Sequence, residues 1–183
     1  PLGIDFHTIC QREKWGEAKS SPQVQEKKLL DISEYRPSQW RAKESLVFMD
    51  AHLTSAANQE DRLEAFSSLN ASGVGFFSLA ALSREDYWKT MSRFKFVISP
   101  LGVGMDCHRT WEALSLGIVP IIRRTTLSPL FSGLPVIEVE SYNEVDKLLL
   151  ESFDYDRPWN REKLTLSFWQ KRISEVMNKA LNT

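Results

Sequence analysis

Short apolar runs alternate with longer amphipathic segments along the chain from about Glu44 onward. Runs of this kind, rich in Val, Ile and Phe, are typical of buried strands, whereas apolar residues at helical spacing are typical of helices. The predicted strands cover residues 45–53, 73–79, 94–98, 118–122 and 135–139. Because helices are predicted between these strands, the pattern indicates an α/β fold: a Rossmann-like, doubly wound parallel sheet with helices on both faces.

Capping residues and apolar stripes locate the predicted helices. Their expected starts lie at Asn58 with Asp61, at Ser83 with Asp86, after Asp106, at Ser141 with Glu144, and at Pro158. A serine followed three residues later by an acidic residue has the spacing of a capping box. Gly117 is the expected C-terminal stop of the helix that begins after Asp106. The last helix carries an apolar stripe from Leu166 to Ala180. Pro120 departs from the strand pattern, because proline donates no ladder hydrogen bond and normally lies at a sheet edge or strand end.

Three segments are expected in this chain, whose 183 residues suffice for one domain of ordinary size. Residues 1–43 do not share the alternation, and we expect an N-terminal arm or linker with a polar helix after Pro22. Residues 44–157 form the predicted Rossmann-like domain. Residues 158–183 form a C-terminal helix that we expect to pack back on the arm or on an N-terminal domain absent from this chain.

Charge and composition argue against several functional classes. Lys and Arg total 23 against 24 Asp and Glu, so the formal net charge is −1 and a nucleic-acid binder that depends on a cationic excess is disfavoured. The longest apolar runs, such as 118–122, are far shorter than the roughly 20 residues of a membrane-spanning helix. Cys10 and Cys107 have no nearby Cys or His pair, so no zinc or redox motif is expected.

The segment SPLGVGMDCHRTWEALSLG follows the third predicted strand and carries the candidate chemistry. Ligands of open parallel sheets bind beyond the carboxyl ends of the strands. Four residues, Ser99, Pro100, Gly102 and Gly104, form a turn of small residues there. Asp106 is the expected cap of the next helix, whose unpaired N–H groups and dipole attract an anion.

Arg109 and Glu112 are three residues apart and share a face of this helix. The guanidinium suits a phosphate, and the carboxylate can accept two hydrogen bonds from a vicinal diol such as a ribose. The pair therefore fits a nucleotide diphosphate. The alternative is an ordinary surface pair worth ~0.2–0.5 kcal/mol, and the spacing alone favours this alternative. The glycines of this segment do not decide between the two interpretations, because the third glycine of the dinucleotide fingerprint and the lysine of a P-loop are both missing.

The stretch KFVISPLGVGMDCHRTWEALSLGIVPII resembles the donor-binding signature of exostosin-like glycosyltransferases, K-F-x-x-x-P-x-G-x-G-x-D-x-x-R-x-x-E-A-L-x-x-G-x-x-P-x-I. The similarity extends more loosely over residues 45–139, about half of the chain. The wider resemblance is to the C-terminal, Rossmann-like half of two-domain GT-B glycosyltransferases. The opening GID is similar to the linker that enters this half, and the long last helix is similar to the one that packs back on the other half.

The resemblance implies a function and a set of site residues. It implies a glycosyltransferase that moves a sugar from a nucleotide-diphosphate sugar to an acceptor hydroxyl in polysaccharide or glycan biosynthesis. Glu112 would hold the ribose, Arg109 and the helix start would face the diphosphate, and Ser99, Pro100, Gly102 and Gly104 would shape the pocket. His52 and Arg62 are further donor-binding candidates. The resemblance implies a UDP-sugar as donor, no cofactor and no metal, because a helix dipole and an arginine replace the divalent ion.

Two further expectations follow from the resemblance. Many retaining relatives have a second Glu eight positions before the ribose-binding one, and Gly104 occupies that position here, which favours an inverting enzyme. An inverting transfer needs a general base, which in GT-B enzymes belongs to the N-terminal half. Asp5 and His7 in the arm are the candidates within this chain, and a surface role for both is the alternative. The compartment would be the Golgi lumen for a eukaryotic relative and the cytoplasm for a bacterial or viral one.

Two other functional classes remain open at this point. One is a non-catalytic α/β module that binds a nucleotide or a partner protein. The other is a regulatory domain of flavodoxin-like type, which predicts an acidic cluster at the strand ends, where only Asp50 is available.

Overall fold

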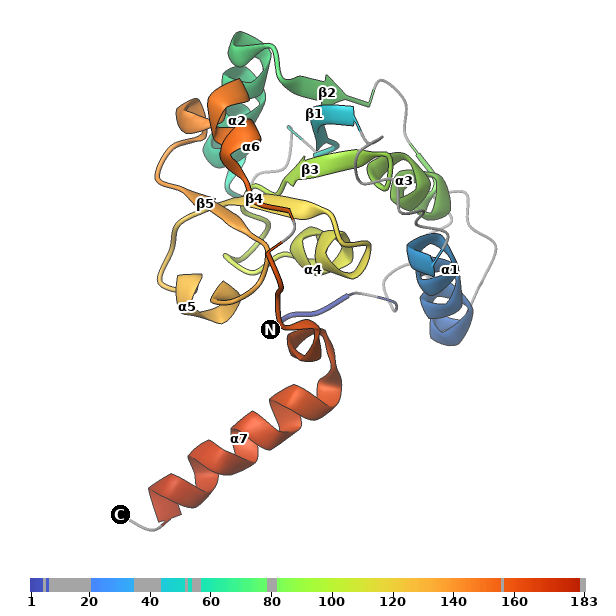
Figure 1. The fold of residues 1–183 in the computed structure, drawn as a ribbon, viewed down its shortest axis with the longest axis vertical. Helices are drawn as coiled ribbons and strands as arrows, with labels where there is room; N and C mark the ends of the chain where they lie inside the picture. Colours follow the sequence, from blue (N-terminus) through green and yellow to red (C-terminus); the bar gives the residue numbers. More distant parts are fainter. Residues whose placement is uncertain are drawn as a thin grey trace.

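The computed structural model describes residues 1–4, 6, 21–34, 44–51, 53, 57–78, 82–155 and 157–181. Within these residues five strands form one sheet in the order β2-β1-β3-β4-β5 (Figure 1). The strands are β1 (Glu44–Met49), β2 (Gly75–Phe77), β3 (Phe94–Ile98), β4 (Val119–Arg123) and β5 (Ile137–Val139). Every neighbouring pair is parallel. The predicted α/β class with a parallel, Rossmann-like sheet is therefore confirmed.

The strand order reverses between β1 and β3. The chain leaves β1 for the edge strand β2 and then crosses back to β3 on the other side of β1. Connections that diverge in this way leave a crevice beyond the carboxyl ends of the two strands, where doubly wound folds bind ligands. Asp50 follows β1, and residues 99–107 follow β3, so these two segments border the expected position.

Helices cover both faces of the sheet (Figure 1). They are α1 (Pro22–Glu34), α2 (Gln59–Ser72), α3 (Arg84–Met91), α4 (His108–Ser115), α5 (Ser128–Phe131), α6 (Lys147–Ser152) and α7 (Leu166–Leu181), with the 3-10 helices η4 (Tyr142–Glu144) and η5 (Arg161–Leu164). Ala65 and Leu69 of α2 pack with Tyr142 and Leu150 against one face. The other face packs against α1, α3 and α4, and a smaller cluster joins α4 to α5 and η5. The sheet therefore separates two apolar layers.

Strand boundaries follow the pairing of neighbouring strands. The third predicted strand, 94–98, is confirmed without change. The first was expected to run to Leu53 but ends at Met49, and the second is confined to Gly75–Phe77. Both end together, because in the part of the chain that the structure describes the ladder between them joins Val47–Gly75 through Met49–Phe77.

Pro120 lies inside β4, which is a central strand rather than a sheet edge. The residue is opposite Val97 of β3, and the first pair between β4 and β5 is Ile121–Ile137. The missing N–H group of Pro120 therefore falls before the β4–β5 ladder begins. A proline at this position removes no hydrogen bond of that ladder.

The prediction of one helix starting at Ser141 is wrong in part. Ser141 and Glu144 do form a capping box, but the helix that follows is the short η4. The chain turns at Val145, whose backbone is extended, and α6 begins separately with Asp146 as its cap. The side chain of Val145 at this turn is buried in the core.

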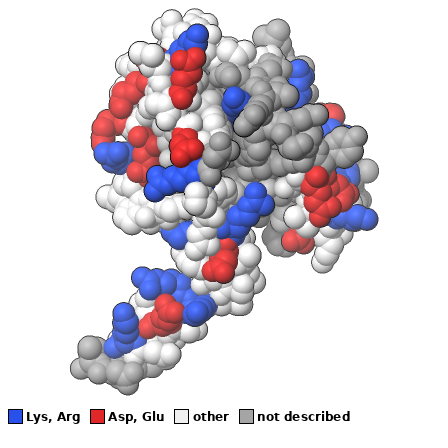
Figure 2. Space-filling view, in the orientation of Figure 1, with Lys and Arg blue, Asp and Glu red and all other residues white. Residues whose placement is uncertain are grey.

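The C-terminal segment contains a long helix, although it begins later than Pro158. After η5, the helix α7 projects away from the sheet (Figure 1) and residues 170–180 are exposed along its length. Its first turns contact the body, where Trp169 packs against the α4–α5 cluster. Lys and Arg side chains are visible on the surface of this helix, beside acidic and uncharged ones (Figure 2). No helix in the described part of the chain has the length and apolar character to cross a bilayer.

The arm is partly joined to the domain. The helix after Pro22 is confirmed as α1, and its Leu29 is buried against α3 and α4. Ile4 of the opening segment packs against two of the apolar clusters.

Candidate functional site

The loop of residues 99–107 lies at the carboxyl end of β3, beside the reversal of strand order. Its first residue, Ser99, is 3 % exposed, and its hydroxyl is hydrogen-bonded to the hydroxyl of Thr110 in α4 at 2.9 Å. Pro100 is also buried. These two residues therefore support the loop from beneath and attach it to the helix, rather than forming an exposed pocket wall.

The glycines of this loop form a tight turn around the thiol of Cys107. The N–H of Gly102 lies 3.1 Å from the carbonyl oxygen of Gly104 and 3.0 Å from the Cys107 sulfur. A Cβ atom at Gly102 would lie 3.1 Å from that sulfur, whereas a Cβ atom at Gly104 would meet nothing within 4 Å. Burial raises the pKa of the Cys107 thiol. Gly102 is therefore needed for a close approach, and Gly104 leaves an exposed part of the loop open.

The prediction that Asp106 caps α4 is wrong. The N-cap residue is Cys107, and the Asp106 carboxylate instead accepts hydrogen bonds from the Trp111 indole at 2.7 Å and from the N–H of Leu2. The hydrogen bonds described for Asp106 are thus with the Trp111 side chain and the start of the chain, and none is with a backbone N–H of α4. The helix begins with His108, and Arg109 follows at the second position.

The side chain of His108 contacts the opening segment of the chain. Its Nδ1 lies 2.6 Å from the carbonyl oxygen of Gly3. Together with the Leu2–Asp106 hydrogen bond, this contact holds the start of the chain against the first turn of α4.

Arg109 points inward, toward the carboxyl end of β1. Its Nη2 donates to the carbonyl oxygen of Asp50 at 2.8 Å. The hydroxyl of Tyr87 lies beside the same guanidinium, and burial raises the pKa of this hydroxyl above its ordinary value. Arg109 thus joins the exit of β1 to the start of α4, at the place where the strand order reverses.

Glu112 also points inward and is 6 % exposed. Its Oε1 atom accepts from Nη2 of Arg84, the first residue of α3, at 2.6 Å. Glu112 and Arg109 therefore have separate partners on separate elements. The interpretation of these residues as an ordinary pair on a helix surface is wrong.

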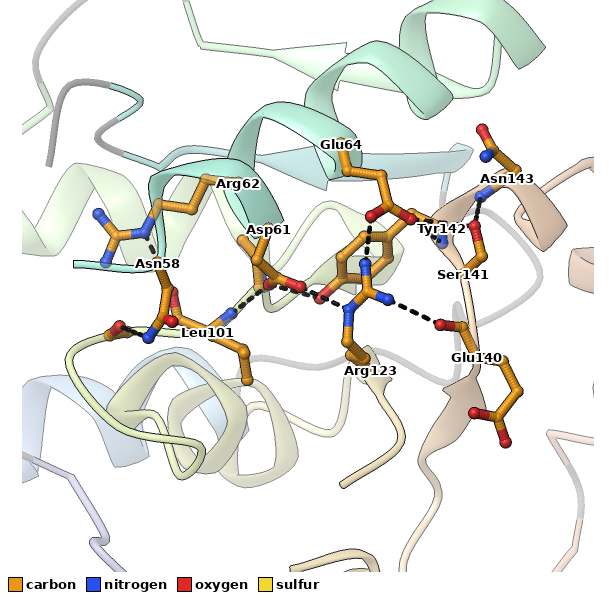
Figure 3. A network of polar contacts seen from close by, with 12 residues as sticks. Asn58, Asp61, Arg62, Glu64, Leu101, Arg123, Glu140, Ser141, Tyr142 and Asn143 are labelled. Carbon is orange, nitrogen blue, oxygen red and sulfur yellow. Dashed lines mark hydrogen bonds and ion pairs between the residues drawn. The ribbon is translucent and has the colours of Figure 1, made fainter. Parts of the chain in front are cut away.

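Three residues at the start of α2 hold the same loop from the other side (Figure 3). Nδ2 of Asn58 donates to the carbonyl oxygen of Gly102 at 2.7 Å, and Nε of Arg62 donates to that of Leu101 at 3.0 Å. The carboxylate of Asp61 accepts from the N–H of Leu101 at 2.7 Å. Arg62, a candidate phosphate ligand, is thus bound through Nε to the loop, and its role toward a phosphate stays a prediction.

Asp61 is also the centre of a polar network (Figure 3). It accepts from the Tyr142 hydroxyl at 3.1 Å and forms an ion pair with Arg123 at the end of β4. Arg123 forms a second ion pair with Glu64. Burial opposes ionisation of Glu64, but hydrogen bonds from Ser141, the Tyr142 N–H and Arg123 together lower its pKa. The arginine that follows β4 is therefore held by carboxylates.

A polar hollow of about 560 Å³ opens over this network. It is lined by Asn58, Gln59, Glu60, Asp61, Glu64 and Arg123. The hollow lies at the start of α2, and two of its lining residues, Asn58 and Asp61, contact the loop after β3. The carboxylates in its lining make it a poor site for a phosphate.

The remaining candidates fall outside the described residues. These are Asp5 and His7, the candidates for a catalytic base, and His52, a candidate donor ligand. Among the residues that the structure describes, no group of three or more His, Cys, Asp or Glu side chains is arranged to hold a metal ion.

The sequence did not predict the roles of Arg84 and Tyr87 or the loop contacts of Asn58 and Asp61. Arg84 follows a predicted cap, but local pattern carries no signal of its pairing with a residue 28 positions later. The same holds for Asp61 and Leu101, which are 40 positions apart.

Comparison with known proteins adds no family assignment: no protein-family model matches the chain, and a search of curated proteins finds no significant match.

Proposed function

We propose that this chain is the donor-binding domain of an inverting, metal-independent glycosyltransferase that uses a nucleotide-diphosphate sugar. The observation that carries the proposal is the placement of Arg109 and Glu112. Both side chains turn inward at the carboxyl edge of the sheet, and each is held by a different neighbouring element. A cationic group at a helix start, with a carboxylate one turn deeper, suits a diphosphate and its ribose.

In this proposal the diphosphate lies at the first turn of α4. The N–H groups of His108 and Arg109, together with the Arg109 guanidinium, stabilise the negative charge that develops on the leaving diphosphate. The reaction breaks the bond between the anomeric carbon and the diphosphate oxygen and forms a bond from that carbon to the acceptor oxygen. A general base takes the proton of the acceptor hydroxyl. Asp5 and His7 stay candidates for this base.

The nucleoside is fixed by Glu112 in this proposal. A carboxylate offers about four acceptor positions, so one hydrogen bond from Arg84 leaves capacity for the two hydroxyls of a ribose. Fixing the nucleoside positions the anomeric carbon against the acceptor, which converts binding energy into rate. The acceptor and the transferred sugar would be bound in part by a second GT-B domain.

The competing function is binding without turnover. The strand order β2-β1-β3-β4-β5 is also that of flavodoxin-like folds, many of which serve as binding or regulatory domains. Such a regulatory domain would carry free carboxylates at the strand ends, yet Asp61 and Glu64 near the end of β4 are paired with Arg123. Transfer of a sugar to an acceptor, or its slow hydrolysis to water, distinguishes an enzyme from a binding module.

The direct test is thermal unfolding of the full chain with UDP, GDP, dTDP and their sugars. A ligand at ~100 times its dissociation constant stabilises the protein by about 2.7 kcal/mol. Arg109→Ala and Glu112→Ala are expected to abolish the shift. The control is Arg124→Ala, which removes an arginine that is 54 % exposed and paired with Glu138 and Glu140. The proposal fails if no nucleotide raises the melting temperature, or if both site variants keep the wild-type affinity.

A further inference from the structure

Arg84 is built into the fold at the start of α3. The preceding residue, Ser83, is the N-cap, and its hydroxyl accepts from the N–H of Asp86. From this capped helix start, the side chain of Arg84 reaches Glu112 of α4.

The guanidinium of Arg84 is enclosed on two sides. Its side chain is 15 % exposed, and Nη2 lies 2.6 Å from Oε1 of Glu112, whose side chain is 8 % exposed. On another side it stacks over the ring of Trp88 at 4.7 Å from the ring centroid. Trp88 itself is 1 % exposed. The carboxylate of Glu112 thus faces a cation that is itself held by the core.

A buried ion pair of this kind contributes little net stability, because the desolvation of both charges offsets their attraction. Its effect lies in fixing the position of the charged groups. A guanidinium is planar and presents its N–H donors in a rigid fork, so it orients a carboxylate more strictly than an ammonium group does. Glu112 can accept hydrogen bonds from a diol only if its carboxylate plane is held in the correct direction.

We propose that Arg84 is a positioning residue that orients the Glu112 carboxylate toward the ribose hydroxyls, and that this pair sets selectivity for ribonucleotides over 2′-deoxyribonucleotides. This inference rests on the proposed function and adds a specificity-determining residue to the same site. Arg84 acts through Glu112 and does not take part in bond breaking.

The test is the ratio of two affinities rather than one affinity. Isothermal titration of the full chain measures binding of UDP and 2′-deoxy-UDP, and of GDP and 2′-deoxy-GDP. Loss of a hydrogen bond to a charged acceptor weakens binding by roughly 10-fold or more, so the wild type is expected to prefer the ribonucleotide by about that factor. Arg84→Gln is expected to bring the ratio of ribonucleotide to 2′-deoxyribonucleotide affinity close to 1. Arg84→Lys is expected to keep part of the wild-type preference for the ribonucleotide.

Lys89→Gln is the matched control. Lys89 lies on the same helix, its side chain is 56 % exposed, and its ion pair at 2.7 Å is with Glu85, within α3. This variant is expected to keep the wild-type ratio. If Arg84→Gln is too unstable to purify, Arg84→Lys keeps a cation beside Glu112, and a wild-type ratio in that variant would overturn the inference.

Each result has a separate meaning. If Arg84 has only a structural role, the Arg84→Gln variant melts earlier and binds both nucleotides more weakly by the same factor, and the preserved ratio overturns this inference alone. If the wild type binds these ribonucleotides without discriminating against the deoxy forms, the inference is overturned while nucleotide binding stands. If the wild type binds none of the four, both the proposed function and the inference fall.

Discussion

The carboxylate of Asp61 in α2 accepts a hydrogen bond from the N–H of Leu101, 40 positions later in the loop after β3, at 2.7 Å. The same carboxylate forms an ion pair with Arg123 and accepts from the Tyr142 hydroxyl. Asp61 is 9 % exposed. One residue therefore connects the candidate donor-binding loop to the end of β4 and to η4 (Figure 3).

This arrangement predicts that Asp61→Ala loosens the loop selectively. The N–H of Leu101 loses its acceptor, so its amide hydrogen is expected to exchange faster with solvent. The free energy of unfolding is expected to fall by about 3 kcal/mol, because a partner of a largely buried ion pair is removed. Hydrogen exchange followed by mass spectrometry or NMR measures the first effect, and urea unfolding measures the second.

The matched control for this prediction is Glu64→Ala. Glu64 forms the other ion pair with Arg123 and accepts from Ser141 and the Tyr142 N–H, but it makes no described contact with the loop. The control is expected to lower stability without faster exchange at Leu101. Equal exchange rates at Leu101 in the two variants would show that Asp61 does not hold the loop.

The two loop glycines predict opposite responses to the same substitution. Gly104→Ala adds a methyl group to open space and is expected to change stability by less than about 0.5 kcal/mol. Gly102→Ala places that methyl group 3.1 Å from the Cys107 sulfur, so the thiol must move and its hydrogen bond from the Gly102 N–H is weakened. We expect a loss of about 1 kcal/mol in urea unfolding. A larger loss for Gly104→Ala than for Gly102→Ala would contradict this packing.

Much of the fold is predictable from the sequence because its signals are local. The strand 94–98 and the cap at Ser83 depend on neighbouring residues, and both are confirmed. The prediction for Asp106 is wrong because its carboxylate binds the N–H of Leu2, 104 positions away, and the Trp111 indole. No local pattern contains the first of these contacts.

The candidate site was predictable only in part, for the same reason. The sequence predicts that Arg109 and Glu112 share a face of one helix, but the partners that hold them come from β1 and α3. Those partners depend on which strands become neighbours. The order β2-β1-β3 that brings Asp50 beside α4 follows from packing over the whole sheet.

An acid-dependent contribution to stability is expected from Glu85 of α3. Hydrogen bonds from Lys28 of α1 and then from Lys89 lower the pKa of Glu85 from 4.5 to about 2. A lowered pKa means that the folded state binds the proton less readily than the unfolded state. The stabilisation is therefore complete above about pH 4.5 and is lost as the pH falls toward about 2.

Glu85→Gln is expected to flatten the pH dependence of unfolding in this window. The effect is small and falls with added salt, because the Lys28 and Lys89 side chains are 43 % and 56 % exposed. Urea unfolding at several pH values between about 4.5 and 2 measures it. Glu151→Gln, whose single partner Lys147 lies 3.6 Å away on α6, is the control and should alter the curve less. Parallel curves for wild type and Glu85→Gln would rule out this contribution.

The exposed stripe of α7 predicts that its apolar residues contribute little to the stability of the isolated chain. Ile173 is 58 % exposed, so Ile173→Ser removes few contacts and is expected to change the free energy of unfolding by less than about 0.5 kcal/mol. Leu69 of α2 is 0 % exposed, and Leu69→Ala leaves a cavity that is expected to cost about 2–5 kcal/mol. Urea unfolding of the two variants measures the contrast. A loss of several kcal/mol for Ile173→Ser would mean that α7 packs against the body or against another copy in solution, and sedimentation velocity then separates these two arrangements by mass.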